Sequence, residues 1–471
     1  MDATQAKQNI ELKWYEKKQG ISLQTKTKKV LGKLERKERR ARGKTKDDTE
    51  KKDKAHSAKQ GTAAGQGKKK RPSPPAPYVT AKEIDSLFRA SSLPEDIKPL
   101  IAKLSEIMDG IYPLNSRQRA LLPQQIRALS HKLTDEREER RLGYMNETTA
   151  LSAYTHYYLW WNLIRLTRLF ANMPDSFFKL TEEDVCLDLG SGPLTVPIAL
   201  FLARPELRKK KLSWYCMDLS AQSLVYGENI FLALAARLKC EPWKITRIKG
   251  EFGTPLREKA SFVSCANMFN ELSQGEAMPP DYLAKKYSDA LLSYTDRRKA
   301  GTRVLVVEPG VPACARFISL LRDALIRRGF FPNSPCPHAG TCPMDGKRDG
   351  KWCNYAFSTE DAPRELMELS EDAGLIKDRA VLSFIAATQG GGSAEDAAPE
   401  AEGSGRTFSF RVASDPIRLP HDRTGYYACS ERGLLLVVTE SELHSGDCLS
   451  VTLRREPDRT DWKSGALIIH L

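Results

Sequence analysis

The sequence predicts an α/β protein built on a doubly wound sheet, with further elements before and after it. Between residues 181 and 332, short apolar runs typical of strands alternate with longer segments of helical periodicity. Strands that alternate with helices form parallel pairs joined by helical crossovers. A glycine-rich turn also follows directly after the first apolar run, in VCLDLGSGPL. Together these features favour an open, mainly parallel sheet covered by helices.

Five strands and four helices are expected in this central region. A helix over 360–375 and a strand over 379–389 then continue the same pattern. The expected strands lie at 185–190, 212–220, 243–250, 262–270 and 303–310. The expected helices lie at 194–203, 220–238, 279–295 and 313–329.

A helical cap is expected before the sheet. Thr80 resembles a helix N-cap with Glu83 three residues later, which is the pattern of a capping box. Apolar residues then recur at helical spacing, most strongly over 151–170. The expected organisation is a basic tail (1–77), the helical cap (78–180), the Rossmann-like domain (181–332), a Cys-rich metal loop with the final sheet elements (333–389), a flexible Gly-rich insertion (390–405) and a β-rich subdomain that completes the metal site (406–471).

The positive charge of the chain is concentrated at its beginning. Residues 1–71 contain 23 Lys and Arg against 9 Asp and Glu, so they hold the whole net charge of +14. A block of this kind is a candidate for phosphate contacts with nucleic acid, or a solubilising tail without a fixed partner. The chain has no apolar run of the roughly 18–20 residues needed for a membrane helix. It also lacks the apolar core of a secretory signal, so an intracellular protein is expected.

The glycine-rich turn predicts a cofactor site. In VCLDLGSGPL, the strand ends at Asp188, and Gly190 and Gly192 turn the chain into a helix. Glycines here allow positive φ angles and a close approach of the backbone to a ligand. Asp218 ends the next strand, where a carboxylate can hold ribose hydroxyls. This arrangement is that of S-adenosylmethionine-dependent methyltransferases, although Leu194 replaces a small residue and is expected to narrow the methionine end.

No catalytic residue is assigned. Amino-group methyltransferases commonly carry an Asn/Asp-Pro-Pro-aromatic motif after the fourth strand, whereas this chain has Asn267-Met268-Phe269-Asn270. Methyl transfer from a sulfonium needs little more than alignment of the acceptor with the methyl group. The sequence is therefore compatible with a methyltransferase and with a protein whose cofactor site is degenerate.

Four cysteines predict a metal site. Cys336, Cys342 and Cys353 lie in one loop, and Cys429 follows later, in the spacing C-x5-C-x10-C-x75-C. This spacing lacks the C-x2-C pairs of most zinc ribbons, whereas iron–sulfur clusters accept more varied spacing. Spacing alone leaves iron–sulfur and zinc equally open, and four unrelated thiols are a third reading. The alternative ligands are His338 and, in place of Cys429, Cys448.

The segments DLGSGP, VVEPGVP and CPHAGTCPMDGKRDGKWCNY, followed by a late Cys, resemble the mitochondrial small-ribosomal-subunit methyltransferase-like family of the Rsm type, which has bacterial members. The resemblance covers residues 95–470, and its most specific parts are Glu308-Pro309-Gly310 and the Cys loop. The helix around YYLWWNLIRL and the insertion at 390–405 depart from the pattern of the family.

The resemblance implies a class I methyltransferase-like fold, a 4Fe–4S cluster and binding to small-subunit ribosomal RNA during assembly. The implied cluster ligands are Cys336, Cys342, Cys353 and Cys429, and the implied cofactor loop is Asp188, Gly190 and Gly192. The expected partners are ribosomal RNA, through the basic tail 1–71, and ribosomal or assembly proteins. The acidic residues near the start favour a bacterial cytoplasm, with the mitochondrial matrix as the alternative. A non-catalytic assembly factor is the alternative function.

Overall fold

The computed structural model describes residues 79–134, 143–272, 278–347, 351–390 and 407–471. All described residues belong to one compact unit, Pro75–Leu471. The basic tail expected over 1–77 lies outside the described residues, as does the insertion expected over 390–405 apart from its first residue.

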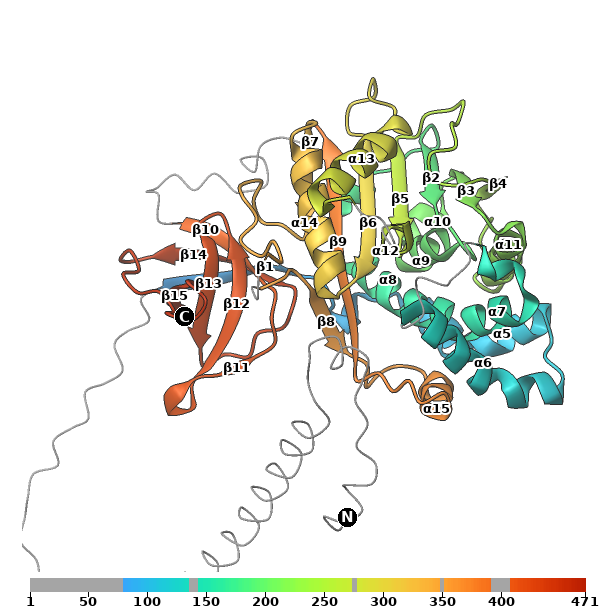
Figure 1. The fold of residues 1–471 in the computed structure, drawn as a ribbon, viewed down its shortest axis with the longest axis horizontal. Helices are drawn as coiled ribbons and strands as arrows, with labels where there is room; N and C mark the ends of the chain where they lie inside the picture. The colour runs from blue at the N-terminus through green and yellow to red at the C-terminus, as the bar shows by residue number, and fades with distance from the viewer. Residues whose placement is uncertain (1–78, 135–142, 273–277, 348–350, 391–406) are drawn as a thin grey trace, which may run out of the picture. The chain divides into compact units, whose positions relative to one another are not determined.

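The larger sheet has the strand order β4-β3-β2-β5-β6-β9-β7, with β8 paired to β9 (Figure 1). Neighbours from β4 to β6 are parallel, whereas β9 is antiparallel to both β6 and β7. The chain thus winds outward from β2 in both directions, which confirms the predicted doubly wound sheet. The strands are β2 (Val185–Leu189), β3 (Ser213–Asp218), β4 (Lys244–Lys249), β5 (Phe262–Ala266), β6 (Arg303–Pro309), β7 (Phe330–Ser334), β8 (Tyr355–Ser358) and β9 (Arg379–Gln389).

Two apolar cores lie on opposite faces of this sheet. Along β2, Cys186 belongs to one core and Leu187 to the other, because successive strand side chains point to opposite faces. The first core contains residues of α8 (Trp160–Asn172), α9 (Thr195–Ala203) and α11 (Ala221–Arg237). The second contains residues of α13 (Pro280–Ser293) and α14 (Pro312–Ile326).

Helices before the sheet form most of the expected cap, and a π-helical turn, η5 (Tyr154–Leu159), lies within the strongest predicted helix. Trp160 and Trp161 follow this turn and are buried, as expected for core residues. The remaining helices are α4 (Lys98–Ala102), α5 (Leu104–Ile111), α6 (Ser116–Thr134), α7 (Thr148–Ala153), α10 (Pro205–Arg208), α12 (Phe269–Leu272) and α15 (Arg364–Asp372). Short 3₁₀ turns lie at Ala90–Ser92, Glu95–Ile97, Tyr144–Asn146, Asp175–Phe178 and Pro420–Asp422.

The smaller sheet contains the C-terminal strands in the order β1-β14-β10-β12-β13-β15, with β11 paired to β12. Phe410, Leu435 and Val437 are fully buried in its core. The β-rich character expected after residue 406 is therefore present. Its strands are β10 (Thr407–Val412), β11 (Ile417–Arg418), β12 (Thr424–Ser430), β13 (Gly433–Thr439), β14 (Asp447–Leu453) and β15 (Leu467–His470).

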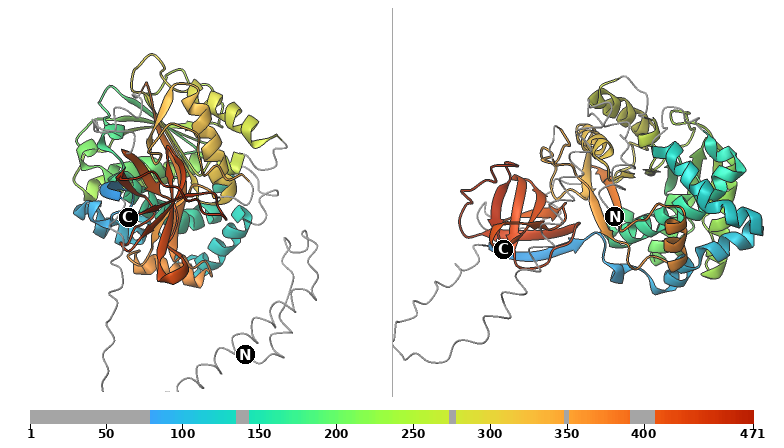
Figure 2. Two further views of the ribbon diagram at one scale, coloured as in Figure 1. Left: turned by 90° about the vertical axis from the view of Figure 1, so that its left-hand side faces the viewer. Right: turned by 60° about the horizontal axis from the view of Figure 1, so that its bottom comes forward.

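The prediction that a helix begins at Thr80 is wrong. Residues Val79–Ser86 form strand β1, which pairs antiparallel with β14 and lies along the C-terminal sheet (Figure 2). The local Thr80…Glu83 pattern resembles a capping box, but pairing with a distant strand outweighs so weak a local preference. The first described segment of the chain is therefore part of the last sheet.

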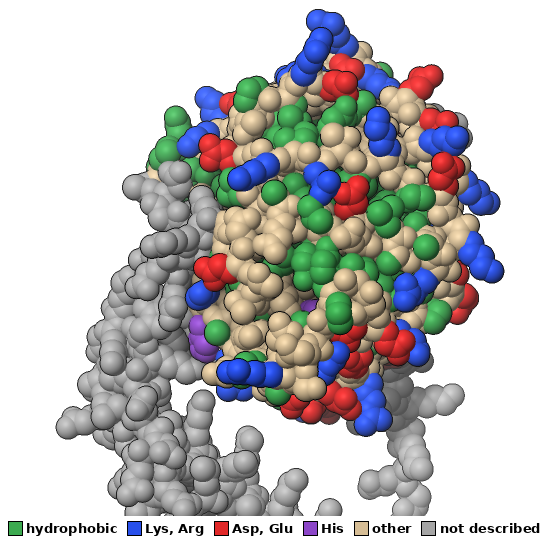
Figure 3. All heavy atoms as spheres, turned by 90° about the vertical axis from the view of Figure 1, so that its right-hand side faces the viewer, with side chains coloured by type: hydrophobic (Ala, Val, Ile, Leu, Met, Phe, Trp, Pro, Cys, Tyr) green, Lys and Arg blue, Asp and Glu red, His purple; other side chains and the backbone are tan. Residues whose placement is uncertain are grey.

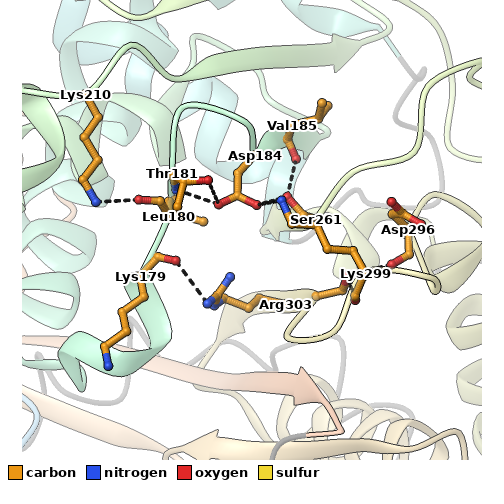
Figure 4. A network of polar contacts seen from close by, with 11 residues as sticks. Lys179, Leu180, Thr181, Asp184, Val185, Lys210, Ser261, Asp296, Lys299 and Arg303 are labelled. Carbon is orange, nitrogen blue, oxygen red and sulfur yellow. Dashed lines mark hydrogen bonds and ion pairs between the residues drawn. The ribbon is translucent and has the colours of Figure 1, made fainter.

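A polar network fixes the end of the large sheet that lies away from the glycine turn (Figure 4). Asp184 accepts hydrogen bonds from the Ser261 hydroxyl and the Lys299 ammonium group, each at 2.6 Å. It also accepts one from the backbone N–H of Thr181 at 2.6 Å. Burial alone would raise the pKa of Asp184, but these donors outweigh burial and lower the pKa to about 2. The network joins the segments that begin β2 and β5.

The described surface has no dominant charge on the face shown in Figure 3, where Lys and Arg are interspersed with Asp and Glu. This agrees with a charge excess carried by residues 1–71. In the described part of the chain, no helix is both long enough and apolar enough to cross a membrane.

Candidate functional site

A cavity of about 130 Å³ lies where the carboxyl ends of β2, β3 and β5 meet. This is the point at which the strand order reverses, where doubly wound sheets usually bind ligands. Asp188, Gly190, Gly192 and Asp218 all line it. The structure thus brings together all four residues that the sequence predicted for a cofactor site.

The glycine turn has the backbone conformation that the sequence predicted. Gly190 and Gly192 have φ angles of +62° and +52°, a region that residues with a side chain rarely adopt. A Cβ atom on Gly190 would also lie 2.9 Å from Cγ of Met268. Glycine is therefore required at position 190 for two reasons. The turn needs a positive φ angle, and Met268 leaves no room for a Cβ atom.

Asp218 holds this turn from the neighbouring strand. Its Oδ2 atom accepts a hydrogen bond from the N–H of Gly192 at 2.8 Å, and its Oδ1 atom accepts one from the N–H of Ser220 at 2.8 Å. Ser220 in turn caps helix α11, since its hydroxyl accepts a hydrogen bond from the N–H of Ser223. Burial raises the pKa of Asp218.

Asp188 has an unused acceptor beside the cavity. Its Oδ1 atom accepts a hydrogen bond from the Ser264 hydroxyl at 2.7 Å. Its Oδ2 atom is buried and meets no described donor at full hydrogen-bond geometry, although the Ser191 hydroxyl lies close enough to lower the pKa of Asp188. Burial raises the pKa of Asp188 to about 7. A buried acceptor without a fully formed hydrogen bond fits a ligand that brings a donor or a positive charge, and S-adenosylmethionine has both.

Residues of the helical cap and of the turn after β5 complete the cavity. Tyr154 of η5 and Asn162 of α8 line it, together with Met145 and Met268. Cε of Met145 lies 3.7 Å from the position of a Cβ atom on Gly192. Sequence reasoning identified none of these four as cavity residues. Met268 lies in the segment that was compared with an acceptor motif, whereas no local motif marks the other three, which only the folded cap brings to the sheet.

Leu194 does not narrow the methionine end, contrary to the expectation from sequence. Its side chain is fully buried in the apolar core and does not line the cavity. Its backbone has a φ angle of +56°, which explains why a small residue is usual there. Met145 and Met268 are the side chains that a Cβ atom on Gly192 or Gly190 would meet.

Glu308 supports the turn after β5. Amino-group methyltransferases commonly carry their Asn/Asp-Pro-Pro-aromatic motif at this position. The two carboxyl oxygens of Glu308 accept hydrogen bonds from the N–H groups of Phe269 at 2.8 Å and Asn270 at 3.1 Å. Burial raises the pKa of Glu308 to about 8, although these two N–H groups act in the opposite direction. In the same turn, Asn267 adopts a left-handed backbone with a φ angle of +57°.

The four predicted metal ligands lie near one another. Burial raises the pKa of the Cys429 thiol, and the charges of Cys336, Cys342 and Cys353 raise it further. Nε of Arg322 donates a hydrogen bond to Sγ of Cys336 at 3.2 Å. The sequence thus identified cysteines that the fold brings together, although three of them come from one loop and the fourth from β12.

The cysteines are not in a metal-binding geometry. Among the residues that the structure describes, no group of three or more His, Cys, Asp or Glu side chains is placed so that it could hold a metal ion. His338 Nε2 lies 3.2 Å from Sγ of Cys429, and its buried Nδ1 atom has no described partner. Cys448 lies apart from the loop cysteines and interacts with Arg411 and Asp85 instead.

The strand order, the glycine turn and Asp218 at the end of β3 together define a class I methyltransferase-like fold. Residues 183–400 match the family described as mitochondrial small ribosomal subunit Rsm22, which confirms the resemblance found in the sequence. The match includes the whole glycine turn and the three loop cysteines, and it ends before Cys429.

Solved methyltransferase structures are similar to this chain at low identity. Precorrin-6y C5,15-methyltransferase from Geobacter metallireducens is 14% identical, with a TM-score of 0.25, over 45% of this chain and 83% of that one. Magnesium protoporphyrin IX methyltransferase from Synechocystis is 13% identical, with a TM-score of 0.26, over 56% and 95%. An RNA methyltransferase from Salinibacter ruber is 18% identical, with a TM-score of 0.19, over 28% and 72%. No curated protein matches the sequence.

Proposed function

We propose that this protein binds S-adenosylmethionine in the cavity. We further propose that it either acts on small-subunit ribosomal RNA or assists the assembly of that RNA into the subunit. The observation that carries the proposal is the cavity itself, where the predicted residues Asp188, Gly190, Gly192 and Asp218 meet. The Rsm22 family match supports the ribosomal part of the proposal.

Each residue has a distinct part in holding the cofactor. Asp218 would accept hydrogen bonds from ribose hydroxyls, because a carboxylate has more acceptor sites than its two backbone donors use. The glycine turn would bring the backbone close to the ligand, and Oδ2 of Asp188 would accept a donor from the methionine part. When bound, S-adenosylmethionine supplies a methyl group on a sulfonium. The chain would contribute alignment and exclusion of water rather than a catalytic base.

The ribosomal partner would be reached partly through charge. Residues 1–71 carry the whole charge excess, so they would make salt-sensitive contacts to phosphates. The name of the matched family points to mitochondria, which supports the matrix rather than a bacterial cytoplasm. Ribosomal or assembly proteins are further partners in this proposal.

We also propose that Cys336, Cys342, Cys353 and Cys429 hold a 4Fe–4S cluster, with zinc as the alternative. The proximity of the other three cysteines to Cys429 and the guanidinium of Arg322 beside Cys336 support a site for a group that is bound by several sulfur atoms. The sulfur atoms would have to move into ligating geometry when the metal binds. The ligands come from a loop and from β12, so a bound cluster would join the two sheets.

A non-catalytic assembly factor is the second candidate function, and the size of the cavity favours it. A volume of about 130 Å³ is below the ~300 Å³ at which small-molecule sites usually begin. Met145 and Met268 occupy the space over the glycine turn. Methionine side chains are flexible, so binding of the cofactor would require them to move.

Calorimetric titration with S-adenosylmethionine tests the proposal. Wild-type protein is compared with Gly190→Ala and with Gly301→Ala, which both place a side chain at a positive φ angle. The new Cβ atom meets Met268 only at position 190, whereas position 301 is open. Binding by the wild type and the Gly301 variant, with loss in the Gly190 variant, is expected. Well-folded wild-type protein that binds no cofactor would establish the non-catalytic alternative.

A further inference from the structure

Arg165 of α8 and Lys377, in the segment between α15 and β9, form a pair of neighbouring cations. Nη1 of Arg165 donates a hydrogen bond to the carbonyl oxygen of Val381 at 3.1 Å. Nζ of Lys377 lies 5.5 Å from the ring centre of Tyr157 and 5.8 Å from that of Trp161. Because Trp161 and Arg165 are four residues apart on one helix, Lys377 and Arg165 lie along the same helix face.

This half-buried pair lacks the carboxylate that cations removed from water normally have. Within the described residues, neither Arg165 nor Lys377 forms an ion pair with Asp or Glu, and their partners are a carbonyl, an amide and aromatic rings. The buried arginines among the described residues each have an aspartate partner. These pairs are Arg168–Asp361, Arg204–Asp175, Arg208–Asp96, Arg322–Asp323 and Arg411–Asp85.

The pKa values of both cations are lowered, as expected where no anion lies beside them. Burial lowers the pKa of Lys377 to about 8, and the positive charge of Arg165 acts in the same direction. Burial also lowers the pKa of Arg165. Two like charges in a half-buried position cost stability unless an anion joins them. A bound anion would remove this cost.

The pair lies next to the cofactor cavity and is partly exposed to solvent. Arg165 donates a hydrogen bond to Oδ1 of Asn162, a residue that lines the cavity. Arg165 and Lys377 are both half-buried, and Ile376, next to Lys377, is 64% exposed. An anion held here would therefore be one side chain away from the cavity and open to solvent.

We propose that Arg165 and Lys377 bind a phosphate group of RNA beside the nucleotide that enters the cofactor cavity. The proposal rests on the proposed function and names the contact that would orient its substrate. A guanidinium offers paired donors that match phosphate oxygens, and an ammonium adds a point charge. The rings of Tyr157 and Trp161 hold the ammonium group in place through cation–π contacts.

The test compares Lys377→Met with Lys377→Arg and with a matched control, Lys351→Met. Lys351 makes the same kind of contact, with Nζ 4.0 Å from the ring centre of Tyr427 on β12. Fluorescence anisotropy with a labelled single-stranded RNA gives affinity over a series of KCl concentrations. Lys377→Met is expected to bind several-fold more weakly and to reduce the slope of log K against log salt by about 0.7, the value of one phosphate contact. The Lys377→Arg and Lys351→Met variants should keep the wild-type slope.

A second probe separates this inference from the proposed function. Pyrophosphate should raise the melting temperature of wild-type protein but not that of Lys377→Met, whether or not the RNA binds. Wild-type protein that binds no RNA but responds to pyrophosphate through Lys377 contradicts the proposed function and supports an anion site. An unchanged RNA slope and an unchanged pyrophosphate response in Lys377→Met overturn the inference. If Lys377→Met instead loses binding of S-adenosylmethionine, the pair binds the carboxylate of the cofactor. That result would also overturn the inference.

Discussion

The carboxylate of Asp218 accepts a hydrogen bond from the backbone N–H of Gly192 across 2.8 Å. This contact joins the end of β3 to the turn that follows β2, so one residue fixes the glycine turn and faces the cavity. The second oxygen of Asp218 accepts the N–H of Ser220 at the start of α11. The residue proposed to bind ribose is therefore also a structural link between two strands and a helix.

Asp218→Asn should weaken both the turn and cofactor binding. The amide nitrogen of Asn would face one of two backbone donors, so one hydrogen bond is lost at a cost of about 1–3 kcal/mol. We expect a lower free energy of unfolding and at least a tenfold loss of S-adenosylmethionine affinity, measured by denaturant titration and calorimetry. Asp289→Asn, at a residue that is 56% exposed and pairs with Arg328, is the control. Unchanged cofactor affinity in the Asp218 variant would show that Asp218 is purely structural.

The affinity for S-adenosylmethionine should rise as the pH rises from 6 to 8. Asp188 has a pKa of about 7 because of burial, so its carboxyl group is mainly neutral at pH 6 and mainly ionised at pH 8. The ionised form attracts the positive charges of the ligand more strongly. Calorimetric titrations at several pH values should show this rise in wild-type protein and a flat profile in Asp188→Asn. A wild-type profile as flat as that of the variant would exclude Asp188 from the cofactor contact.

The sequence predicts the larger sheet well because its signals are local. Strands β2, β3, β5 and β6 are mainly apolar runs, whereas β4 alternates apolar residues with charged or polar ones, and the glycine turn carries its own conformational requirement. Strand β1 was missed because its state depends on pairing with β14, far along the chain. Met145 and Met268 were missed for a related reason, since only the folded cap and the turn after β5 place them over the glycines.

Which of Cys429 and Cys448 lies near the three loop cysteines, and so can be the fourth metal ligand, also depends on the register of the smaller sheet. Arg411 on β10 lies opposite Cys429 on one side and opposite Cys448 on the other. Side chains directly opposite one another in neighbouring strands share a face of the sheet. Both cysteines therefore face the same way, and only their order across the sheet places Cys429 near the loop cysteines. No spacing rule along the chain contains this information.

The stability of the protein should fall with rising pH because of Glu308. In the folded state burial raises the pKa of Glu308 to about 8, whereas the unfolded carboxyl ionises near 4.5. Between these values the folded state binds more protons, so this residue stabilises the fold below pH 4.5 and loses that contribution as the pH rises through 8. Glu308→Gln should remove this component from urea titrations at pH 5, 7 and 9, while Glu228→Gln should not. An equal pH slope in wild type and the Glu308 variant would contradict the prediction.

The proposed metal site predicts that replacing Cys429 and replacing Cys448 have different effects on metal content, although both residues lie opposite Arg411 in the smaller sheet. After anaerobic purification, wild-type protein should contain iron and sulfide and absorb visible light as thiolate-bound clusters do. Cys429→Ser should lose the metal, because it removes one of four proposed ligands, whereas Cys448→Ser should retain it because Cys448 interacts with Arg411 and Asp85 instead. Metal analysis and the absorption spectrum of the three proteins measure this. A colourless wild-type protein with one zinc would establish the zinc alternative, and loss of metal in the Cys448 variant alone would mean that Cys448, not Cys429, is the fourth ligand.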